Sequence, residues 1–559
     1  MVITLIVWLY IFTILTSLGI LFNRISLLAI KDKSLLNENS IIQHIFNGFC
    51  LCMGLCSLLY FFSNIGFTVH LLIAIPSLIS IYFFRNDWKI IISKVKNAAI
   101  SFNLWQWLLI FIGFISILLA TIEEPTNIDT GNYHAQSIKW MNEYKIIPGL
   151  GNLLGNLAYN QSNFLVEAFF SFSFLNYGTF RILNGFLVLV FILNIIKTFN
   201  LKNLKFNAIQ FIGSIIIIFF FIHYKNWISS PSPDVIITLM TYYIFYEGIK
   251  RLTNNPLQET DNTLISIYFI AISALTVKLS AITLPFLAIV LILRTPLFFK
   301  QGRVIFYALL TLIIIVPWLV RNVFFSGYLI FPVAEIDLFN VDWKIPRELV
   351  IGVKNAIHGF STNSQMSSVE IMKLTLWDRI IIWINTNYWY RILYLLIILF
   401  SQFYFIKLFF SKAKLSYKKT SLILLGFTTF LGVVFWFLTA PDFRFGSALV
   451  YMSISTTLII TIPKKVYLNR FFGHSFILLT LFFLFRKMHV EELYNHPLKP
   501  APYPKVEVKI NNGKNFRYAI PKNNYQCWDY NLPCVPFGDL SIVKQRGEDI
   551  EDGFKYDFN

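Results

Sequence analysis

Charged side chains are scarce in this sequence, and several of them stand at the ends of long apolar stretches. A carboxylate can deprotonate an attacking hydroxyl group, whereas Arg and Lys side chains can hold the oxygens of a phosphate group. Candidates for both kinds of chemistry occur in five short motifs: IDTGNYH with Asp129 and His134, SPSPD with Asp234, KLSA with Lys278, PWLVRN with Arg321 and Asn322, and APDFRFG with Asp442 and Arg444. Together they predict a site for an anionic substrate, with Asp129 and Asp234 as its catalytic carboxylates.

The two acids also have a simpler interpretation. Asp129 precedes a turn that begins at Thr130, and it can cap the helix that follows, a contact that contributes about 1 kcal/mol. Asp234 follows Pro231 and Pro233, which end the preceding helix, and so it falls in the first turn of the next one. For both acids the sequence leaves two alternatives open: a helix cap, or a general base or ligand of a divalent cation such as Mg²⁺ or Mn²⁺.

The composition of the chain is that of an integral membrane protein. Of the 559 residues, 56% are hydrophobic and only 14% are charged, and the mean hydropathy is +0.63. A transmembrane helix needs about 20 apolar residues, or fewer where neighbouring helices cover its ends. We therefore predict an all-α fold with about 14 transmembrane helices, at residues 3–22, 45–62, 66–84, 105–121, 179–198, 208–223, 234–248, 264–277, 281–294, 304–320, 391–410, 421–440, 446–462 and 470–486.

The basic residues alternate along this series of helices. Of the 47 Lys and Arg residues, 23 fall in every second loop: 24–33, 85–96, 197–205, 250–251, 294–303, 407–419 and 464–470. Short loops rich in Lys and Arg stay on the cytoplasmic side of a membrane, so the five motifs are expected on the outer side. Loops that face anionic lipids account for much of the net charge of +18, which therefore does not require a nucleic-acid partner. An isolated outer Arg, in turn, often only extends its charge to the lipid headgroups.

The first large outer loop, residues 122–163, carries Asp129. Within it, residues 133–147 have apolar side chains at helical spacing and are followed by a proline and a glycine. Tyr133, Trp140 and Tyr144 are of the types that favour the headgroup region. We expect an amphipathic helix that lies along the outer surface of the membrane.

The chain divides into three parts, which are N-terminal transmembrane helices in residues 1–104, a core with the motif-bearing loops in residues 105–486, and a polar, proline-rich tail in residues 487–559. The tail is too hydrophilic to re-enter the bilayer, so we expect a small extracytoplasmic domain. Cys527 and Cys534 fall in this tail, where an oxidising compartment would permit a short disulfide loop. Cys50, Cys52 and Cys56 fall in one predicted helix and are expected to pack against apolar neighbours, with a metal site as the minor alternative.

The motifs resemble those of a known family. IDTGNYH after the fourth predicted helix, SPSPD before the seventh, KLSA between the eighth and ninth, PWLVRN followed by a glycine and a proline, and APDFRFG together resemble the multi-spanning glycosyltransferases of the GT-C superfamily. The resemblance covers about residues 105–450 and extends to uncharacterised bacterial members associated with surface polysaccharide synthesis. It implies transfer of a sugar, with inversion, from a polyprenyl-phosphate-linked donor to a glycan or lipid acceptor outside the bacterial cytoplasmic (inner) membrane.

The resemblance also implies roles for single residues. Asp129 occupies the acidic position in the first large outer loop, which is the usual base, and Asp234 matches a second acidic position that is sometimes a metal ligand. Lys278 and Arg321 match contacts to the donor phosphate. We expect the remaining motif residues to bind substrate as well: His134, Asn322, Asp442 and Arg444.

Two features depart from the better-known members of that superfamily. Three predicted helices precede the one that leads to Asp129, which places the N-terminus outside. His134 follows the first acidic position in place of a second carboxylate, which leaves metal dependence open. Two rival functions also fit a multi-spanning protein. A polysaccharide polymerase or ligase would use the same lipid-phosphate chemistry, whereas a lipid-linked-sugar flippase or other transporter would need charged groups near the middle of the membrane.

Overall fold

The computed structural model describes residues 1–30, 40–176, 178–199, 208–254, 262–293, 302–386, 388–410, 417–461, 470–486 and 488–558. Most of these residues are helical. The helices are α1 Val2–Ile30, α2 Ile41–Leu59, α3 Phe67–Phe83, α4 Arg85–Ser101, α5 Leu104–Ile122, α6 Ala135–Glu143, α7 Asn163–Phe170, α8 Leu183–Ile196, α9 Ala208–Tyr224, α10 Pro233–Asn254, α11 Asn262–Val277, α12 Thr283–Leu293, α13 Arg303–Ser326, α14 Arg347–Thr362, α15 Ser368–Lys373, α16 Leu376–Thr386, α17 Tyr388–Phe409, α18 Tyr417–Thr439, α19 Phe443–Thr461, α20 Arg470–Phe485 and α21 Glu492–Asn495.

The long helices are those of a helical membrane protein. Among the described residues, six helices are long and apolar enough to cross a membrane, namely α1, α2, α5, α13, most of α18 and the segment Ile209–Trp227. Two bent helix pairs, α3 with α4 and α16 with α17, raise this number to eight if each pair forms one span. Each of the fourteen predicted ranges overlaps one helix. The remaining helices of that series are shorter or less apolar, and fourteen spans stay a prediction.

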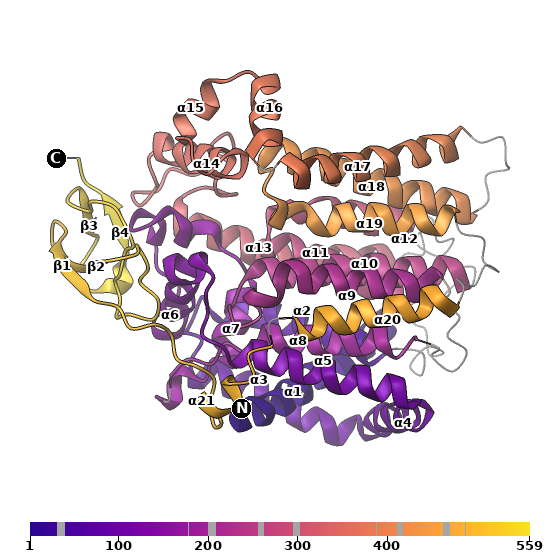
Figure 1. Cartoon of the computed structure of the whole chain (residues 1–559). Helices are drawn as coiled ribbons and strands as arrows, with labels where there is room; N and C mark the ends of the chain where they lie inside the picture. Colours follow the sequence, from indigo (N-terminus) through magenta and orange to yellow (C-terminus); the bar gives the residue numbers. More distant parts are fainter. Residues whose placement is uncertain are drawn as a thin grey trace.

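The helices lie side by side in one bundle (Figure 1), and its helices approach closely where glycine allows it. A Cβ atom on Gly19 of α1 would lie 1.8 Å from the backbone oxygen of His44, and one on Gly48 of α2 would lie 1.8 Å from that of Leu15. Small residues are favoured at helix contacts in membranes because the backbones can then pack directly against each other. These two glycines fix the contact between α1 and α2 at the start of the chain.

The two ends of the bundle differ. The tail, residues 488–558, lies at one end, which we call the tail end, and α4 lies at the other (Figure 1). The residues predicted as a basic loop, 85–96, form most of helix α4, whose axis makes an angle of 84° with that of α3. Most other predicted basic loops extend beyond the described residues, in particular at residues 31–39, 200–207, 294–301, 411–416 and 462–469.

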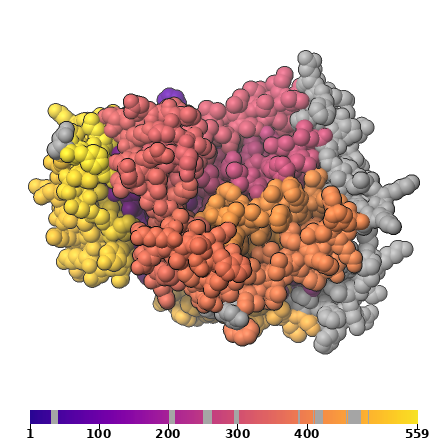
Figure 2. Space-filling view, turned by 90° about the horizontal axis from the view of Figure 1, so that it is seen from above, coloured from indigo at the N-terminus to yellow at the C-terminus, as the bar shows by residue number. Residues whose placement is uncertain are grey.

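The tail contains two small antiparallel sheets. Strand β1 Val508–Asn512 pairs with β2 Arg517–Pro521, and β3 Val543–Gln545 pairs with β4 Phe554–Tyr556. A disulfide joins Cys527 to Cys534. The tail also contacts residues between α13 and α14, since Arg546 pairs with Asp342 at 2.9 Å. Figure 2 shows the tail side by side with the segment that contains α14 and α15.

The tail covers the first large loop, and this corrects the prediction of a surface helix at residues 133–147. The helical part is shorter: a π-helical turn at Thr130–His134 leads into α6, which ends at Glu143. Trp140 is 1% exposed and Tyr133 is 7% exposed, so neither can lie among lipid headgroups. The apolar side that was predicted to face the membrane packs instead against α7 and the tail, for example with Trp140 against Phe554.

Candidate functional site

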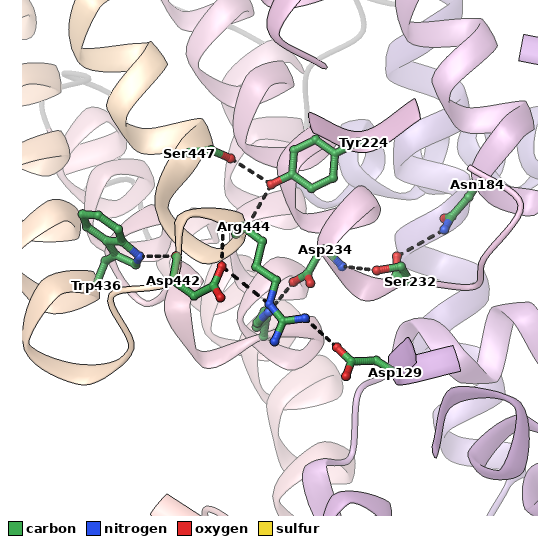
Figure 3. Close-up of polar contacts among 10 residues, drawn as sticks. Asp129, Asn184, Tyr224, Ser232, Asp234, Trp436, Asp442, Arg444 and Ser447 are labelled. Carbon is green, nitrogen blue, oxygen red and sulfur yellow. Dashed lines mark hydrogen bonds and ion pairs between the residues drawn. The ribbon is translucent and has the colours of Figure 1, made fainter. Parts of the chain in front are cut away.

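Four segments that are far apart in the sequence meet at the tail end of the bundle. Asp129 precedes the turn before α6, Asp234 lies in the first turn of α10, Lys278 follows α11, and Asp442 and Arg444 stand at the start of α19. We call these five residues the charged cluster. Figure 3 shows the Arg444 side chain between Asp129 and Asp442, with Asp234 beside it.

Asp129 pairs with Arg444. Their Oδ2 and Nη1 atoms are 2.8 Å apart. Within the described residues the Asp129 side chain makes no cap contact with the turn at Thr130–His134. Instead, the backbone N–H of Asp129 donates to Asn127 Oδ1 at 3.0 Å, which fixes the residue from its N-terminal side. The helix-cap interpretation of Asp129 therefore does not describe its geometry, because the carboxylate is turned toward Arg444.

Asp234 pairs with Lys278, and both are largely buried, with 5% and 17% of their side chains exposed. The cap contact that the sequence allowed for Asp234 belongs to Ser232, whose hydroxyl accepts the Asp234 N–H at 3.3 Å. Ser232 is held in turn by Asn184, which donates to its backbone oxygen at 3.1 Å. Burial lowers the pKa of Lys278 from its usual value, although the Asp234 carboxylate acts in the opposite direction.

The turn at the start of α19 holds Arg444 in place. The Asp442 carboxylate accepts the backbone N–H of Arg444 at 3.0 Å, and its Oδ1 atom lies 3.7 Å from Nε of the same arginine. Trp436 Nε1–H donates to the backbone oxygen of Asp442, and the Tyr224 hydroxyl donates to that of Arg444. The Phe445 ring lies against both cations of the cluster, 3.6 Å from Lys278 Nζ. Asp442 thus positions Arg444 and adds a third carboxylate beside it.

His134 lies next to the cluster but does not belong to its ion pairs. Its side chain is 1% exposed, and Nδ1 lies 3.3 Å from the Thr130 hydroxyl. Burial lowers the pKa of His134 to about 3, with the Asp234 carboxylate acting in the opposite direction. The imidazole is therefore neutral near pH 7. It can donate one hydrogen bond and accept another, but it carries no positive charge.

Arg321 and Asn322 lie apart from the charged cluster. Arg321 is fully buried, and its Nη2 donates to the Ser162 hydroxyl at 2.6 Å, while its Nε and Nη1 have no hydrogen-bond partner among the described residues. Asn322 Oδ1 accepts from the Asn160 amide at 3.0 Å. The link to the cluster is indirect, since the backbone N–H of Ser162 donates to the oxygen of Thr276, two residues before Lys278.

Tyr159 is a neighbour of the cluster that the motifs did not indicate. It stands on a short 3-10 turn at Gly155–Tyr159, and its ring packs edge to face on Tyr133. Burial raises the pKa of Tyr159, and the nearby Asp129 carboxylate raises it further. The signal that could have identified it is the stretch AYNQSN, an aromatic residue and amides in an otherwise apolar loop.

The cluster is poorly suited to a divalent cation. Such ions bind several oxygen ligands with little positive charge nearby. Here Asp129 and Asp234 each face the positive charge of Arg444 or Lys278. The described residues also contain no group of three or more His, Cys, Asp and Glu side chains arranged to hold a metal ion. The charged side chains themselves are therefore the groups that can carry the chemistry of the site.

Comparison with known proteins identifies the family but no relative of established activity. No curated protein and no solved structure matches the chain. The model of a family described as a domain of unknown function (DUF8201) matches residues 1–451, more than half of the chain, and this range includes the whole charged cluster. The chain therefore belongs to the DUF8201 family.

Proposed function

We propose that the protein is a GT-C-like glycosyltransferase, which moves a sugar from a polyprenyl-phosphate-linked donor to a hydroxyl of a glycan or lipid acceptor. The observation that carries this proposal is the charged cluster, in which two carboxylate–cation pairs meet at one end of a helical membrane protein. The motif resemblance to the GT-C superfamily supports it. The same chemistry would serve a polysaccharide polymerase or ligase, which differs in the length of its product.

The two ion pairs suggest how the donor prepares the site. A lipid phosphate brings negative charge into the cluster and competes with the carboxylates for Lys278 and Arg444. When Arg444 turns to the phosphate, the Asp129 carboxylate loses its partner at 2.8 Å. A carboxylate without a cation is a stronger base, because nothing stabilises its charged form. Donor binding would thus activate Asp129 at the moment when it is needed.

The transfer step then follows from the charges. The acceptor oxygen attacks the anomeric carbon while Asp129 takes its proton, and the bond from that carbon to the phosphate oxygen breaks. The electron pair of this bond stays on the polyprenyl phosphate, where Lys278 and Arg444 stabilise the charge that develops. Attack opposite to the phosphate inverts the configuration of the sugar. Asp234 keeps Lys278 in place, and neutral His134 offers a hydrogen bond to substrate.

The proposal includes a topology. Fourteen helices would cross the bacterial cytoplasmic membrane, with the charged cluster and the tail on the extracytoplasmic side. Two observations support this orientation: the tail and the cluster lie at the same end of the bundle, and α4, with Arg85, Lys89, Lys94 and Lys96, lies at the opposite end (Figure 1). Basic residues favour the cytoplasmic side, which supports an orientation with α4 on that side. The disulfide fits an oxidising compartment on the other side.

The test is a mass-spectrometric profile of envelope glycans and lipid-linked sugars in cells that express the wild type or Asp129→Asn at equal level. We expect one glycan to lose a sugar and the corresponding lipid-linked donor to accumulate in the variant. Asp337→Asn is the matched control, because Asp337 is an exposed acid in the loop after α13 whose pair, Lys344, lies outside the cluster. Its profile should equal that of the wild type.

The profile also separates the rival functions. If Asp129→Asn leaves the glycans unchanged while deletion of the whole protein alters them, catalysis by Asp129 is wrong and transport of the lipid-linked sugar becomes the better explanation. Loss of long chains with retention of single repeat units would instead indicate a polymerase.

A further inference from the structure

The loop closed by the disulfide, residues Cys527–Cys534, lies directly on the segment that follows Asp129. We call it the disulfide loop. The Trp528 N–H donates to the backbone oxygen of Gly131 at 3.0 Å. In the other direction, the Gln136 amide donates to the backbone oxygens of Trp528 and Tyr530 at 3.0 and 2.9 Å. Three backbone groups of the disulfide loop therefore form hydrogen bonds with the short stretch from Gly131 to Gln136.

A charged contact strengthens the same interface. Lys139 Nζ donates to the backbone oxygen of Asp529 at 3.0 Å and lies 3.5 Å from its carboxylate. The Asp529 side chain also accepts from the Thr179 hydroxyl at 3.2 Å, which ties the disulfide loop to the residues before α8. The disulfide loop thus bridges two parts of the bundle that border the site.

Gly131 shows how close the approach is. A Cβ atom at this position would lie 2.8 Å from the side chain of Gln526 and 2.9 Å from that of Trp528. Any other residue would push the disulfide loop away, so the glycine of IDTGNYH is explained by contact with the tail and not by its own backbone conformation. Gly131 is two residues from Asp129 and lies in the π-helical turn that Asp129 precedes.

The disulfide loop is itself held in a fixed shape. Cys527 is fully buried and Cys534 nearly so. The strand β2 supports the far side, because the Ala519 N–H donates to Pro533 and the Val535 N–H donates to Ala519. A covalently closed loop on a sheet can present its backbone groups with little freedom. None of its residues, however, contacts the charged cluster in an ion pair or hydrogen bond among the described residues.

We propose that the disulfide loop is the positioning element for Asp129 in the transfer reaction, with Gln136 and Trp528 as its positioning residues. This inference rests on the proposed function for its catalytic readout only. The disulfide loop lies outside the residues that match the family model, whereas the whole charged cluster lies within them. Without its contacts to the disulfide loop the turn after Asp129 becomes mobile, and the carboxylate no longer stays where Arg444 and the acceptor meet.

The experiment compares three full-length variants in detergent: Cys527→Ser with Cys534→Ser, Gln136→Leu, and the control Asp342→Asn. The control breaks a different tail contact, that of Arg546 and Lys555 with Asp342. Amide hydrogen exchange measured by mass spectrometry should rise at least tenfold in residues 127–144 for the first two variants. It should remain at the wild-type rate there for the control.

Turnover gives the second readout. In the first two variants kcat should fall at least tenfold while KM for the donor stays within twofold, because Lys278 and Arg444 are untouched. Gln136→Glu keeps the size of the side chain but loses the N–H donor, so its activity should be as low as that of Gln136→Leu. If Gln136 only fills space, Gln136→Glu should instead retain the wild-type activity.

The possible results decide between the two proposals. Unchanged exchange in residues 127–144 for Gln136→Leu overturns the positioning role, even if the cysteine variant does not fold. Exchange that rises equally in Asp342→Asn also overturns it, since the tail would then only stabilise the fold. If exchange rises as expected but Asp129→Asn leaves the glycans unchanged, the disulfide loop does hold the turn after Asp129, but the proposed function is wrong.

Discussion

Arg444 and Arg321 are two arginines near the same end of the bundle with opposite surroundings. Arg444 lies 2.8 Å from the Asp129 carboxylate and 3.7 Å from that of Asp442. Arg321 is fully buried beside Ser162 and faces Tyr60 and Cys56, which are uncharged in their usual forms. The sequence motifs predicted that both residues bind substrate, but among the described residues only Arg444 pairs with carboxylates.

The difference between the two arginines indicates that a phosphate site needs carboxylates beside its cation. A cation paired with carboxylates is already stable in its place, and a phosphate can take over the role of a carboxylate with little change in net charge. A buried cation without a counter-charge is costly, so replacing it with an apolar side chain can leave the stability unchanged or raise it. We therefore expect the charged cluster to react strongly to neutralisation in activity, and Arg321 to react mainly in stability.

The largest effect should come from unbalancing the more buried pair. Asp234→Asn leaves Lys278 without its counter-charge and should lower the stability by about 3–5 kcal/mol. The double variant Asp234→Asn with Lys278→Gln should recover most of this loss in a thermal melt in detergent, because no charge is left unpaired. Its transfer activity should remain lost. Recovery of activity in the double variant would show that the pair is only structural.

The comparison of the two arginines is sharpest in activity. Arg444→Gln should lower the consumption of lipid-linked donor in isolated membranes by about 10²–10³-fold, the usual effect of removing one charge-stabilising donor from a transition state. Arg444→Lys should keep part of the activity, since a point charge remains. Arg321→Gln should lower it by less than tenfold when folded protein is compared at equal amount. Equal losses in the two Gln variants would place Arg321 back among the phosphate contacts.

The two arginines should also differ in the sign of their effect on stability. Arg321→Met replaces a buried cation without a counter-charge with an apolar side chain of similar length. We expect the free energy of unfolding to stay the same or to rise by up to about 2 kcal/mol, and the melting temperature to follow it. Arg444→Met should lower it, because Asp129 and Asp442 then repel each other. A melting temperature that falls in Arg321→Met would mean that the Ser162 hydrogen bond outweighs the cost of burying the charge.

The smallest effect concerns His134 and pH. The folded protein keeps this imidazole neutral, with a pKa of about 3, whereas an unfolded histidine has a pKa of about 6.5. The unfolded state therefore binds more protons below pH 6.5, and stability falls as the pH drops. At pH 5.5 the loss should be about 1 kcal/mol. His134→Gln should make the melting temperature less sensitive between pH 7 and 5.5, whereas an unchanged pH dependence would contradict the neutral buried state.

Part of the fold and of the site could be predicted from the sequence. Apolar runs located each helix of the predicted series, because the length and composition of a membrane helix are set by the bilayer itself. The alternation of basic loops placed Asp129, Asp234 and Lys278 at one end of the bundle. The pairing of these residues could not be read, because which carboxylate meets which cation depends on the contacts between helices distant in sequence.

The error at residues 133–147 has the same origin. An amphipathic pattern reports that one side of a helix is covered, but not whether lipid or protein covers it. The tail was predicted as a separate polar domain, so nothing in the sequence suggested that its strand β4 would contact Trp140. The surroundings of Arg321 could not be read from the sequence either, because its hydrogen bond to Ser162 joins residues 159 positions apart.

The hydrogen bond between Gln136 and Trp528 joins residues that are 392 positions apart in the chain. A ribosome that adds 5–20 residues per second needs about 20–80 s to cover that distance. For this time α6 can pack against α7 but lacks its contacts with the tail, among them that of Trp140 with Phe554. Proteases and chaperones that recognise exposed apolar segments can therefore distinguish an interrupted chain from a complete one at the helix that follows Asp129.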